Sequence, residues 1–289
     1  MSAAARLREL LAGHELIIAP GVYDGISAAL VDNLGFPAAY MTGAGVSVAG
    51  YGLPDVGLLT LTEMAERARV LAGLLDVPVI ADADTGYGSP INVVRTVIEY
   101  ERAGVAAIQL EDQIFPKRCG HLAGKEVIDA ARFQVTLRAA LEARTNPDTV
   151  IIARTDARAP LGIEEAISRG CAYAEAGADV IFVEAPESVE EVERIAREIH
   201  APLLLNVVPG GRTPEIPAER LAELGFRIAI HPGVALGAMA GAAIGALNEL
   251  AGTSGIETSE DPAGFFELFG LTHWQQLGES YSAYEQDAP

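Results

Sequence analysis

The chain has 289 residues, half of them hydrophobic, and a formal net charge of −20. This length allows one large domain or two small ones, and the acidic charge argues against nucleic acid and anionic membrane surfaces as partners. An anionic substrate would therefore need a local cation, supplied by arginine, lysine or a metal ion.

The cysteines, Cys119 and Cys171, are too few for a disulfide framework. Residues 1–10 contain no apolar core of the kind found in signal peptides. No run approaches the length of a membrane span. We therefore expect a reduced, soluble, cytoplasmic protein with no membrane partner.

Short β-branched runs alternate with amphipathic runs along the chain. The expected strands span residues 16–20, 38–42, 77–84, 106–112, 149–156, 179–185, 202–208 and 227–233. The expected helices span residues 24–35, 61–76, 91–104, 129–144, 162–177 and 188–200, with capping boxes at Thr60–Glu63 and Ser188–Glu191. Strands that are apolar throughout are buried on both faces, as in a parallel sheet.

Eight strand–helix units in a chain of this size indicate an α/β protein with a closed (β/α)8 barrel. The alternative is a doubly wound open sheet. We expect one barrel domain over residues 1–289, in which two helices within residues 256–289 form a C-terminal extension for subunit contact. The fourth unit differs, because a long loop with Gly120 and Gly124 precedes its helix, and such loops are often lids.

Polar residues stand at the carboxyl ends of nearly all the expected strands, where barrels of this kind carry their chemistry. In chain order they are Tyr40, Thr42, Asp82, Asp84, Glu111, Asp112, Arg154, Asp156, Glu184, Asn206 and His231.

Asp82, Asp84 and Glu111 form a candidate metal site. Because side chains alternate along a strand, both aspartates can face the barrel mouth, and Glu111 comes from the neighbouring strand. Three unpaired carboxylates are costly to bury, and a hard cation with oxygen ligands, Mg²⁺ or Mn²⁺, resolves this. The alternative is that one of the aspartates caps the following loop.

Cys119 lies in the long loop between cations, because Lys117 and Arg118 precede it and His121 follows it. Nearby cations lower the pKa of a thiol and favour the reactive thiolate. The alternative is an idle, solvent-exposed cysteine. Cys171 falls in an expected helix and is interpreted as a small core residue.

Three further features point to substrate binding. Arg154 can clamp a carboxylate, or it can pair with Glu184 or Asp156 instead. Tyr40 is either a general acid or base, or a packed ring whose hydroxyl is hydrogen-bonded. The turn at residues 42–45 offers backbone N–H groups to an anion, although a short Gly-x-Gly turn is weak evidence.

Eight stretches together resemble the isocitrate lyase / phosphoenolpyruvate mutase superfamily along almost the whole chain. They are YMTGAG (40–45), GLPDVG (52–57), ADADTGYG (81–88), LEDQ (110–113), KRCGH (117–121), ARTDA (153–157), VEA (183–185) and N-x-x-x-GG-x-TP (206–214). KRCGH marks the lyase side of the superfamily, since the phosphoenolpyruvate mutases proper lack this cysteine. The loop is most similar to those of 2-alkylmalate lyases, oxaloacetate hydrolases and carboxyphosphonoenolpyruvate mutase, and less so to methylisocitrate lyase.

This resemblance implies a metal-dependent barrel whose last helix is exchanged between subunits, in a homotetramer built as a dimer of helix-swapped dimers. It implies that Asp82 holds Mg²⁺, while Asp84 and Glu111 act directly or through water. It also implies that Cys119 is the catalytic acid or base on the closing lid, with His121 beside it. The substrate-binding residues that it implies are Thr42, Gly43, Ala44, Asp55, Gly120, Arg154, Glu184 and Asn206.

Three positions depart from the patterns of these relatives. Val208 stands where methylisocitrate lyases carry a threonine, and Gly237 stands where they carry an arginine. Those two side chains help to hold the additional carboxylate of a tricarboxylate, so their absence argues against a strict methylisocitrate or isocitrate lyase. Pro209 replaces a glutamate that is common in the alkylmalate and carboxyphosphonate relatives.

Residues and resemblance together predict a Mg²⁺-dependent carbon–carbon lyase. It would cleave a 2-hydroxy dicarboxylate, a 2-alkylmalate or a methylisocitrate-like acid, to a 2-oxo acid and a carboxylic acid by retro-aldol chemistry. We expect Cys119 to protonate the enolate that cleavage leaves, His121 to orient it, and Tyr40 to take the hydroxyl proton. The alternatives are an oxaloacetate hydrolase that forms oxalate and acetate, a phosphonate enzyme of the carboxyphosphonoenolpyruvate mutase type, and a non-catalytic barrel that binds small acids.

Overall fold

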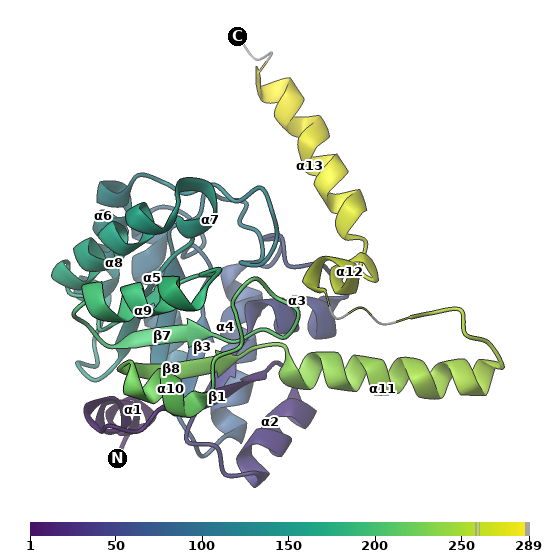
Figure 1. Ribbon diagram of the computed structural model, residues 1–289, viewed down its shortest axis with the longest axis horizontal. Helices are drawn as coiled ribbons and strands as arrows, with labels where there is room; N and C mark the ends of the chain where they lie inside the picture. The colour runs from purple at the N-terminus through teal and green to yellow at the C-terminus, as the bar shows by residue number, and fades with distance from the viewer. Residues whose placement is uncertain (258, 260, 287–289) are drawn as a thin grey trace.

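The computed structural model describes residues 1–257, 259 and 261–286. Within these residues, eight parallel strands form a closed barrel in the order β1 to β8 (Figure 1). The strands are β1 (Ile17–Val22), β2 (Ala39–Met41), β3 (Val79–Asp82), β4 (Ala107–Glu111), β5 (Val150–Thr155), β6 (Val180–Val183), β7 (Leu203–Asn206) and β8 (Phe226–His231). The closed barrel is confirmed, and each expected strand overlaps an observed one.

Helices surround the barrel and extend beyond it. They are α1 (Ala3–Ala12), α2 (Gly25–Asn33), α3 (Gly43–Tyr51), α4 (Leu61–Leu74), α5 (Pro90–Ala103), α6 (Ala130–Ala143), α7 (Arg158–Leu161), α8 (Ile163–Glu175), α9 (Val189–Glu198), α10 (Ala218–Glu223), α11 (Val234–Ala251), α12 (Pro262–Glu267) and α13 (Leu271–Gln286). The six expected barrel helices are confirmed as α2, α4, α5, α6, α8 and α9. Glycine is unfavourable inside helices, and α3 and α11 are rich in it, so the sequence pattern did not locate them.

One of the two expected capping boxes is complete. Glu63 accepts hydrogen bonds from the backbone N–H and the hydroxyl of Thr60. At the start of α9, Ser188 accepts from the backbone N–H of Glu191, whereas the Glu191 side chain pairs with Arg158 and does not return to Ser188. The Ser188–Glu191 box is therefore only half formed, because an ion pair takes its carboxylate.

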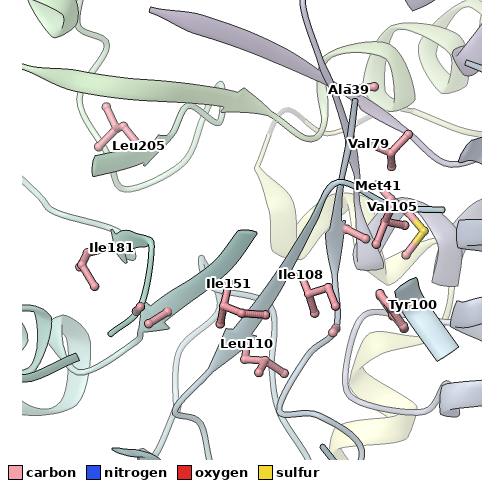
Figure 2. Packing of buried hydrophobic residues seen from close by; sticks show 14 of the residues in the cluster. Ala39, Met41, Val79, Tyr100, Val105, Ile108, Leu110, Ile151, Ile181 and Leu205 are labelled. Carbon is pink, nitrogen blue, oxygen red and sulfur yellow. The ribbon is translucent and has the colours of Figure 1, made fainter. Parts of the chain in front are cut away.

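Strand alternation decides which side chains reach the barrel mouth. Residues on one face fill the barrel interior, and they include Ile80, Ile152, Phe182 and Leu204. Residues on the other face, such as Val79, Ile108 and Ile151, belong to one cluster with side chains of the outer helices, among them Tyr100 of α5 (Figure 2). Two positions beyond the interior residues, on the same face, come the polar residues Asp82, Arg154, Glu184 and Asn206.

The segment between β4 and α6 contains the expected long loop, and we call residues 112–128 the lid. Two hydrogen bonds close its base: the N–H of Ile128 donates to the carbonyl of Asp112, and the N–H of Ile114 donates to that of Glu126, both at 2.9 Å. Arg169 of α8 adds a bond to the Ile128 carbonyl at 2.8 Å. The base of the lid is thus fixed to the barrel.

One helix of the described residues, α11, is long and apolar enough to cross a membrane by length and composition alone. Its 18 residues have a mean hydropathy of 1.5, and none of them is buried. The expectation that no run approaches the length of a membrane span is therefore wrong. The helix contacts β1 where it starts and then points away from the barrel (Figure 1).

The chain returns to the barrel mouth after α11. Phe266 of α12 and Leu271, the first residue of α13, pack with Val48 and with Leu122 of the lid. From there α13 leads away from the barrel (Figure 1). Both expected tail helices are confirmed, whereas residues 258, 260 and 287–289 of the expected extension lie outside the described residues.

Candidate active site

A cavity of about 680 Å³ opens at the carboxyl ends of the strands. Most of the expected site residues line it: Tyr40, Thr42, Ala44, Asp55, Asp82, Cys119, Gly120, His121, Arg154 and Asn206. The remaining four lie behind this wall and contact it: Gly43, Asp84, Glu111 and Glu184. The structure therefore brings together the site residues expected from the strand ends and from the resemblance. Three other expected strand-end residues do not line the cavity: Asp112, Asp156 and His231.

Asp82 at the end of β3 is held by three donors. They are the backbone N–H groups of Gly43 and Asp84, at 3.2 and 3.1 Å, and the amide of Gln109 at 3.2 Å. A side chain at position 43 would not fit, because its Cβ would lie 2.7 Å from the Asp82 carboxylate. The close approach of α3 to this carboxylate therefore requires glycine.

Asp84 and Glu111 are buried carboxyl groups with raised pKa values. Burial, opposed by Lys117 and reinforced by the neighbouring Asp82, raises the pKa of Asp84 to about 6. Burial also raises the pKa of Glu111 well above its usual range. One oxygen of Glu111 accepts no hydrogen bond from the described residues. The cluster thus has an excess of negative charge and a free oxygen.

Lys117 of the lid lies among these carboxylates. Its ammonium pairs with Asp55 and, at 2.7 Å, with Asp84. Among the described residues, no three acidic, histidine or cysteine side chains come close enough to hold a metal ion between them. The expected convergence of three carboxylates is therefore not found. The oxygen donors nevertheless suit a hard cation. Asp82 could bind such an ion as the main carboxylate, and the Glu111 oxygen that has no hydrogen-bond partner among the described residues could support it.

Arg154 of β5 is buried and held in one orientation. Asp156 accepts two bonds from its guanidinium, at 2.8 and 3.0 Å, and Glu184 lies 3.5 Å away. The ring of Phe182 lies 5.1 Å from its Cζ. The pairing with Asp156 and Glu184 is thus confirmed, yet Arg154 still lines the cavity and presents its charge there.

Tyr40 is a buried phenol rather than a base in this site. Its hydroxyl donates to the side-chain oxygen of Gln109 at 3.0 Å. Burial raises its pKa well above the usual range, and Asp82 adds to the shift. A phenol whose proton is held so firmly is a poor proton acceptor, so this environment disfavours the base role expected for Tyr40.

The thiol of Cys119 lines the cavity, but the expected lowering of its pKa is wrong. Burial, followed by the charge of Asp55, raises its pKa to about 12, and the opposing effect of Lys117 is smaller. Lys117 is already neutralised by the two aspartates that it contacts. Cys119 is therefore a thiol at neutral pH, the form that can donate a proton.

The ring of His121 is turned toward Glu184 rather than toward the thiol. Its Nδ1 accepts a bond from the backbone N–H of Arg212 at 3.1 Å, and burial lowers its pKa. A neutral ring with an occupied Nδ1 carries its hydrogen on Nε2, which lies 3.2 Å from Glu184. The backbone of His121, rather than its ring, acts on the Cys119 thiol, since it lowers the pKa of that thiol against the effect of burial.

The turn after β2 begins α3, and Thr42 caps it by accepting from the N–H of Gly45 at 3.2 Å. Two of the three expected N–H donors are already used: Thr42 donates to Val22, and Gly43 donates to Asp82. Within the described hydrogen bonds, this leaves the N–H of Ala44 at the positive end of the helix dipole. It lies at the cavity wall and can receive an anion.

The wall formed by the residues that follow β7 and β8 is mainly apolar, with Glu215 as its one charged residue among those described. It includes the three positions that depart from the family patterns, Val208, Pro209 and Gly237. Val234 and Leu236 extend this wall. The lysine, arginine and histidine residues that line the cavity come from the lid and from β5, so this wall offers no cation within the described residues.

Two residues of the site had no assigned role in the sequence. Gln109 bonds to both Tyr40 and Asp82, and its place two residues before Glu111 could have located it by alternation. Lys125 belongs to the same lid as KRCGH and is buried, which nothing in a polar loop sequence indicates.

The chain matches known proteins along most of its length. The family model described as phosphoenolpyruvate phosphomutase matches residues 7–251. A 2,3-dimethylmalate lyase of Eubacterium barkeri is 46% identical over 286 residues, which cover 98% of this chain and 99% of that relative. A 2-methylisocitrate lyase of Aeropyrum pernix is 47% identical over 226 residues, which cover 78% of this chain and 72% of that relative.

Solved structures agree with these relatives. Oxaloacetate acetylhydrolase in complex with the inhibitor 3,3-difluorooxalacetate has a TM-score of 0.84 at 41% identity, covering 97% of both chains. A 2,3-dimethylmalate lyase, described as a member of the PEP mutase/isocitrate lyase superfamily, has a TM-score of 0.84 at 42% identity, covering 97% of this chain and 96% of that one. The chain therefore belongs to the phosphoenolpyruvate mutase / isocitrate lyase superfamily.

Proposed function

We propose that the protein is a Mg²⁺-dependent carbon–carbon lyase that cleaves a 2-alkylmalate to a 2-oxo acid and a carboxylic acid. One observation carries the proposal: the protonated thiol of Cys119 lines the same cavity as the charged Arg154 and as the mainly apolar wall that follows β7 and β8. The reaction of relatives named 2,3-dimethylmalate lyase and 2-methylisocitrate lyase supports the same bond cleavage.

The charged side of the cavity would bind the 2-hydroxy acid end of the substrate. Arg154 and the N–H of Ala44 are placed to receive its carboxylate. Asp82 would hold Mg²⁺ or Mn²⁺, with Asp84 and Glu111 acting directly or through water. When bound, such an ion lowers the pKa of a coordinated hydroxyl and offsets carboxylate charge.

Cys119 would complete the reaction. The C2 hydroxyl would give its proton to the carboxylates of Asp82, Asp84 and Glu111 as the C2–C3 bond breaks and leaves an electron pair on C3, and the thiol donates its own proton to that carbon. The proton held by the carboxylates then returns to the thiolate by way of solvent after the products leave. The closed lid keeps bulk water from the carbanion, and the bond from the N–H of Cys119 to the carbonyl of Asp55, at 3.1 Å, holds this residue in place. Tyr40 acts through Gln109, which it fixes against Asp82.

The apolar wall favours an alkyl substituent over a third carboxylate. A carboxylate against Val208, Pro209 and Leu236 would lose its water and gain no cation among the described residues. A methyl group there would instead gain from burial, at roughly 0.8 kcal/mol per carbon. This supports an alkylmalate rather than methylisocitrate as the substrate.

The proposal extends to the assembly. We propose a homotetramer, a dimer of helix-swapped dimers, in which residues 1–289 form one barrel domain and residues 256–289 serve as an extension for subunit contact. The support is α11, whose apolar side chains are unburied and which points away from its own barrel (Figure 1). A cytoplasmic location is proposed because both cysteines are free thiols.

An NMR assay with Mg²⁺ tests the activity. Oxaloacetate, 2-methylmalate, 2,3-dimethylmalate and methylisocitrate are offered in parallel to the wild type and to Cys119→Ser. Pyruvate released from the malates, and lost in the variant and on chelation of the metal, is the expected result. Oxalate and acetate from oxaloacetate alone would identify a hydrolase instead. No product from all four acids would contradict both activities.

A further inference from the structure

Lysine is confined to the lid in this chain. Of its 20 basic residues, Lys117 and Lys125 are the only lysines, and the rest are arginines. The two lysines flank Cys119, and both side chains are almost fully buried, at 5% and 1% exposure. A buried ammonium is a compact charge that can bond to several acceptors around one point, whereas a guanidinium is planar and larger.

Lys125 joins the lid to the residue that orients Arg154. Its ammonium donates to the carbonyl of Gly120 at 2.5 Å and to Asp156 at 2.8 Å. Gly120 directly follows Cys119 in the lid. Asp156 is the carboxylate that accepts both bonds from Arg154. One ammonium thus connects the peptide next to the thiol with the guanidinium that faces the substrate.

This residue does not touch the cavity in the described part of the chain, so it takes no direct part in the reaction. The hydrogen bonds at the base of the lid do not depend on it, since they join Asp112 to Ile128 and Ile114 to Glu126. Losing the ammonium would therefore leave the base of the lid closed. It would remove the charged partner of a backbone carbonyl near the tip.

We propose that Lys125 is a positioning residue that couples lid closure to the orientation of Arg154 by bridging the Gly120 carbonyl and Asp156. Through this bridge, Cys119 comes into place only when Arg154 is held by Asp156. The inference rests on the proposed role of Cys119 as the proton donor. The bridge from Lys125 to the Gly120 carbonyl and Asp156 can nevertheless be tested without any substrate.

Alkylation of Cys119 tests the bridge without any substrate. In the closed lid Cys119 is only partly exposed, and burial raises the pKa of its thiol, so iodoacetamide modifies it faster when the lid opens. Cys171, a free thiol on α8, serves as the internal reference in the same molecule. The ratio of the two modification rates, read by mass spectrometry, reports how often the lid is open.

In Lys125→Met we expect this ratio to rise about tenfold to a hundredfold, the effect of losing one charge-assisted hydrogen bond. The matched control is Glu126→Gln, which removes a charge from an exposed neighbour whose side chain makes no ion pair among the described residues. Its ratio should equal that of the wild type. A folded Lys125→Met protein with an unchanged ratio would overturn the proposal.

A second measurement uses wild-type protein, so it stands even if the variant fails to fold. Native protein is briefly acetylated on lysine, then treated with iodoacetamide, unfolded and digested with trypsin. Cleavage after Lys125 gives the peptide 119–125, whereas acetylated Lys125 resists cleavage and gives the peptide 119–132. Cys119 should be alkylated more in the longer peptide, and equal alkylation in both would overturn the bridge.

Kinetics separate this inference from the proposed function. With the malate that the wild type cleaves, Lys125→Met should lower kcat far more than it raises KM, because the bridge acts on the placement of the thiol. A wild type that cleaves no malate would contradict the proposed function and leave the labelling results intact. Normal kcat in Lys125→Met would contradict the coupling alone.

Discussion

The chemistry of Cys119 is decided by residues from other parts of the barrel. Its sequence neighbour Lys117 pairs with Asp55 and Asp84. These two carboxylates offset the positive charge of Lys117, so the ammonium has little effect on the pKa of the thiol. Burial and Asp55 then raise the pKa of the thiol to about 12. The group is therefore suited to donate a proton and poorly suited to act as a nucleophile.

This thiol gives a pH prediction. A raised pKa means that the acid form is fully present at neutral pH and is lost only as the pH rises toward about 12. We therefore expect kcat for the cleaved malate to show no thiol-dependent fall between about pH 7 and pH 9, whereas a thiol with an ordinary pKa of about 8.5 would titrate there. A pH–rate profile checks this.

The control for that profile is Cys171→Ala, which should superimpose on the wild type because Cys171 lies on α8, away from the cavity. A descending limb near the ordinary thiol pKa in both proteins would contradict the raised pKa of Cys119.

The positions of the site residues could be predicted from the sequence, but the protonation state of Cys119 could not. Side chains alternate along β3, β5 and β6, so the predicted end of each strand is enough to place Asp82, Arg154 and Glu184 on the face that points to the barrel mouth. A pKa depends on burial and on charges that come from distant segments. Asp55 is such a charge, and only the closed barrel brings it to Cys119.

Among the elements, the lid depends most on a close fit. Gly120 packs against the charged residues of the barrel mouth, and a Cβ at this position would lie 2.5 Å from Nη2 of Arg154 and 2.6 Å from the Glu184 carboxyl. Both side chains are buried and paired, so neither can move aside freely. The lid can therefore close completely only with glycine at position 120.

Gly120→Ala should lower kcat/KM by roughly a hundredfold, because a displacement of about 1 Å at the lid misplaces the thiol. The barrel core is unaffected, so the melting temperature should stay close to that of the wild type. Steady-state kinetics and thermal unfolding measure the two effects.

The matched control is Gly73→Ala in α4, where a Cβ meets no atom within 4 Å. It makes the same chemical change, and it should keep full activity and stabilise the helix by about 0.5–1 kcal/mol. Equal activity of the two variants would contradict the close fit of Gly120.

The lid itself was predictable as an element, because its length and its glycines distinguish it from the other strand–helix connections. The helix α3 was not, since its sequence GAGVSVAGY has the glycines of a turn and no polar face. Its N-terminus must approach Asp82 closely, and that requirement places glycine where helix propensity disfavours it.

At the scale of the whole molecule, the exposure of the apolar helix α11 has no explanation within a single subunit. The residues of α11 are apolar except for Asn248 and Glu249 near its end, none is buried, and the helix points away from the barrel (Figure 1). Helix patterns are recognised by a polar face opposite an apolar one. This helix has no polar face, which is why its range could not be assigned from the sequence.

Charge placed on α11 should therefore break the assembly. Leu247 and Leu250 are 63% and 85% exposed. In the double variant Leu247→Lys/Leu250→Lys, lysine charges would have to be buried at a subunit contact, so we expect the tetramer to fall to smaller species. Light scattering after size exclusion measures the mass.

Leu34→Lys serves as the control for charge, since Leu34 is 73% exposed at the end of α2 on the barrel itself. Its mass should match that of the wild type. A monomeric wild type, or an unchanged mass in the double variant, would contradict the exchanged helix.

The most direct test of the account is cleavage of 2,3-dimethylmalate in D₂O, followed by NMR, for the wild type and for Cys119→Ala. The wild type should release pyruvate and propionate in equal amounts, with one deuterium at C2 of propionate delivered by the exchanged thiol. The variant should be slower by about 10²–10⁴-fold, the usual contribution of a positioned general acid. A folded variant that releases singly deuterated propionate at the wild-type rate would show that Cys119 is not the proton donor.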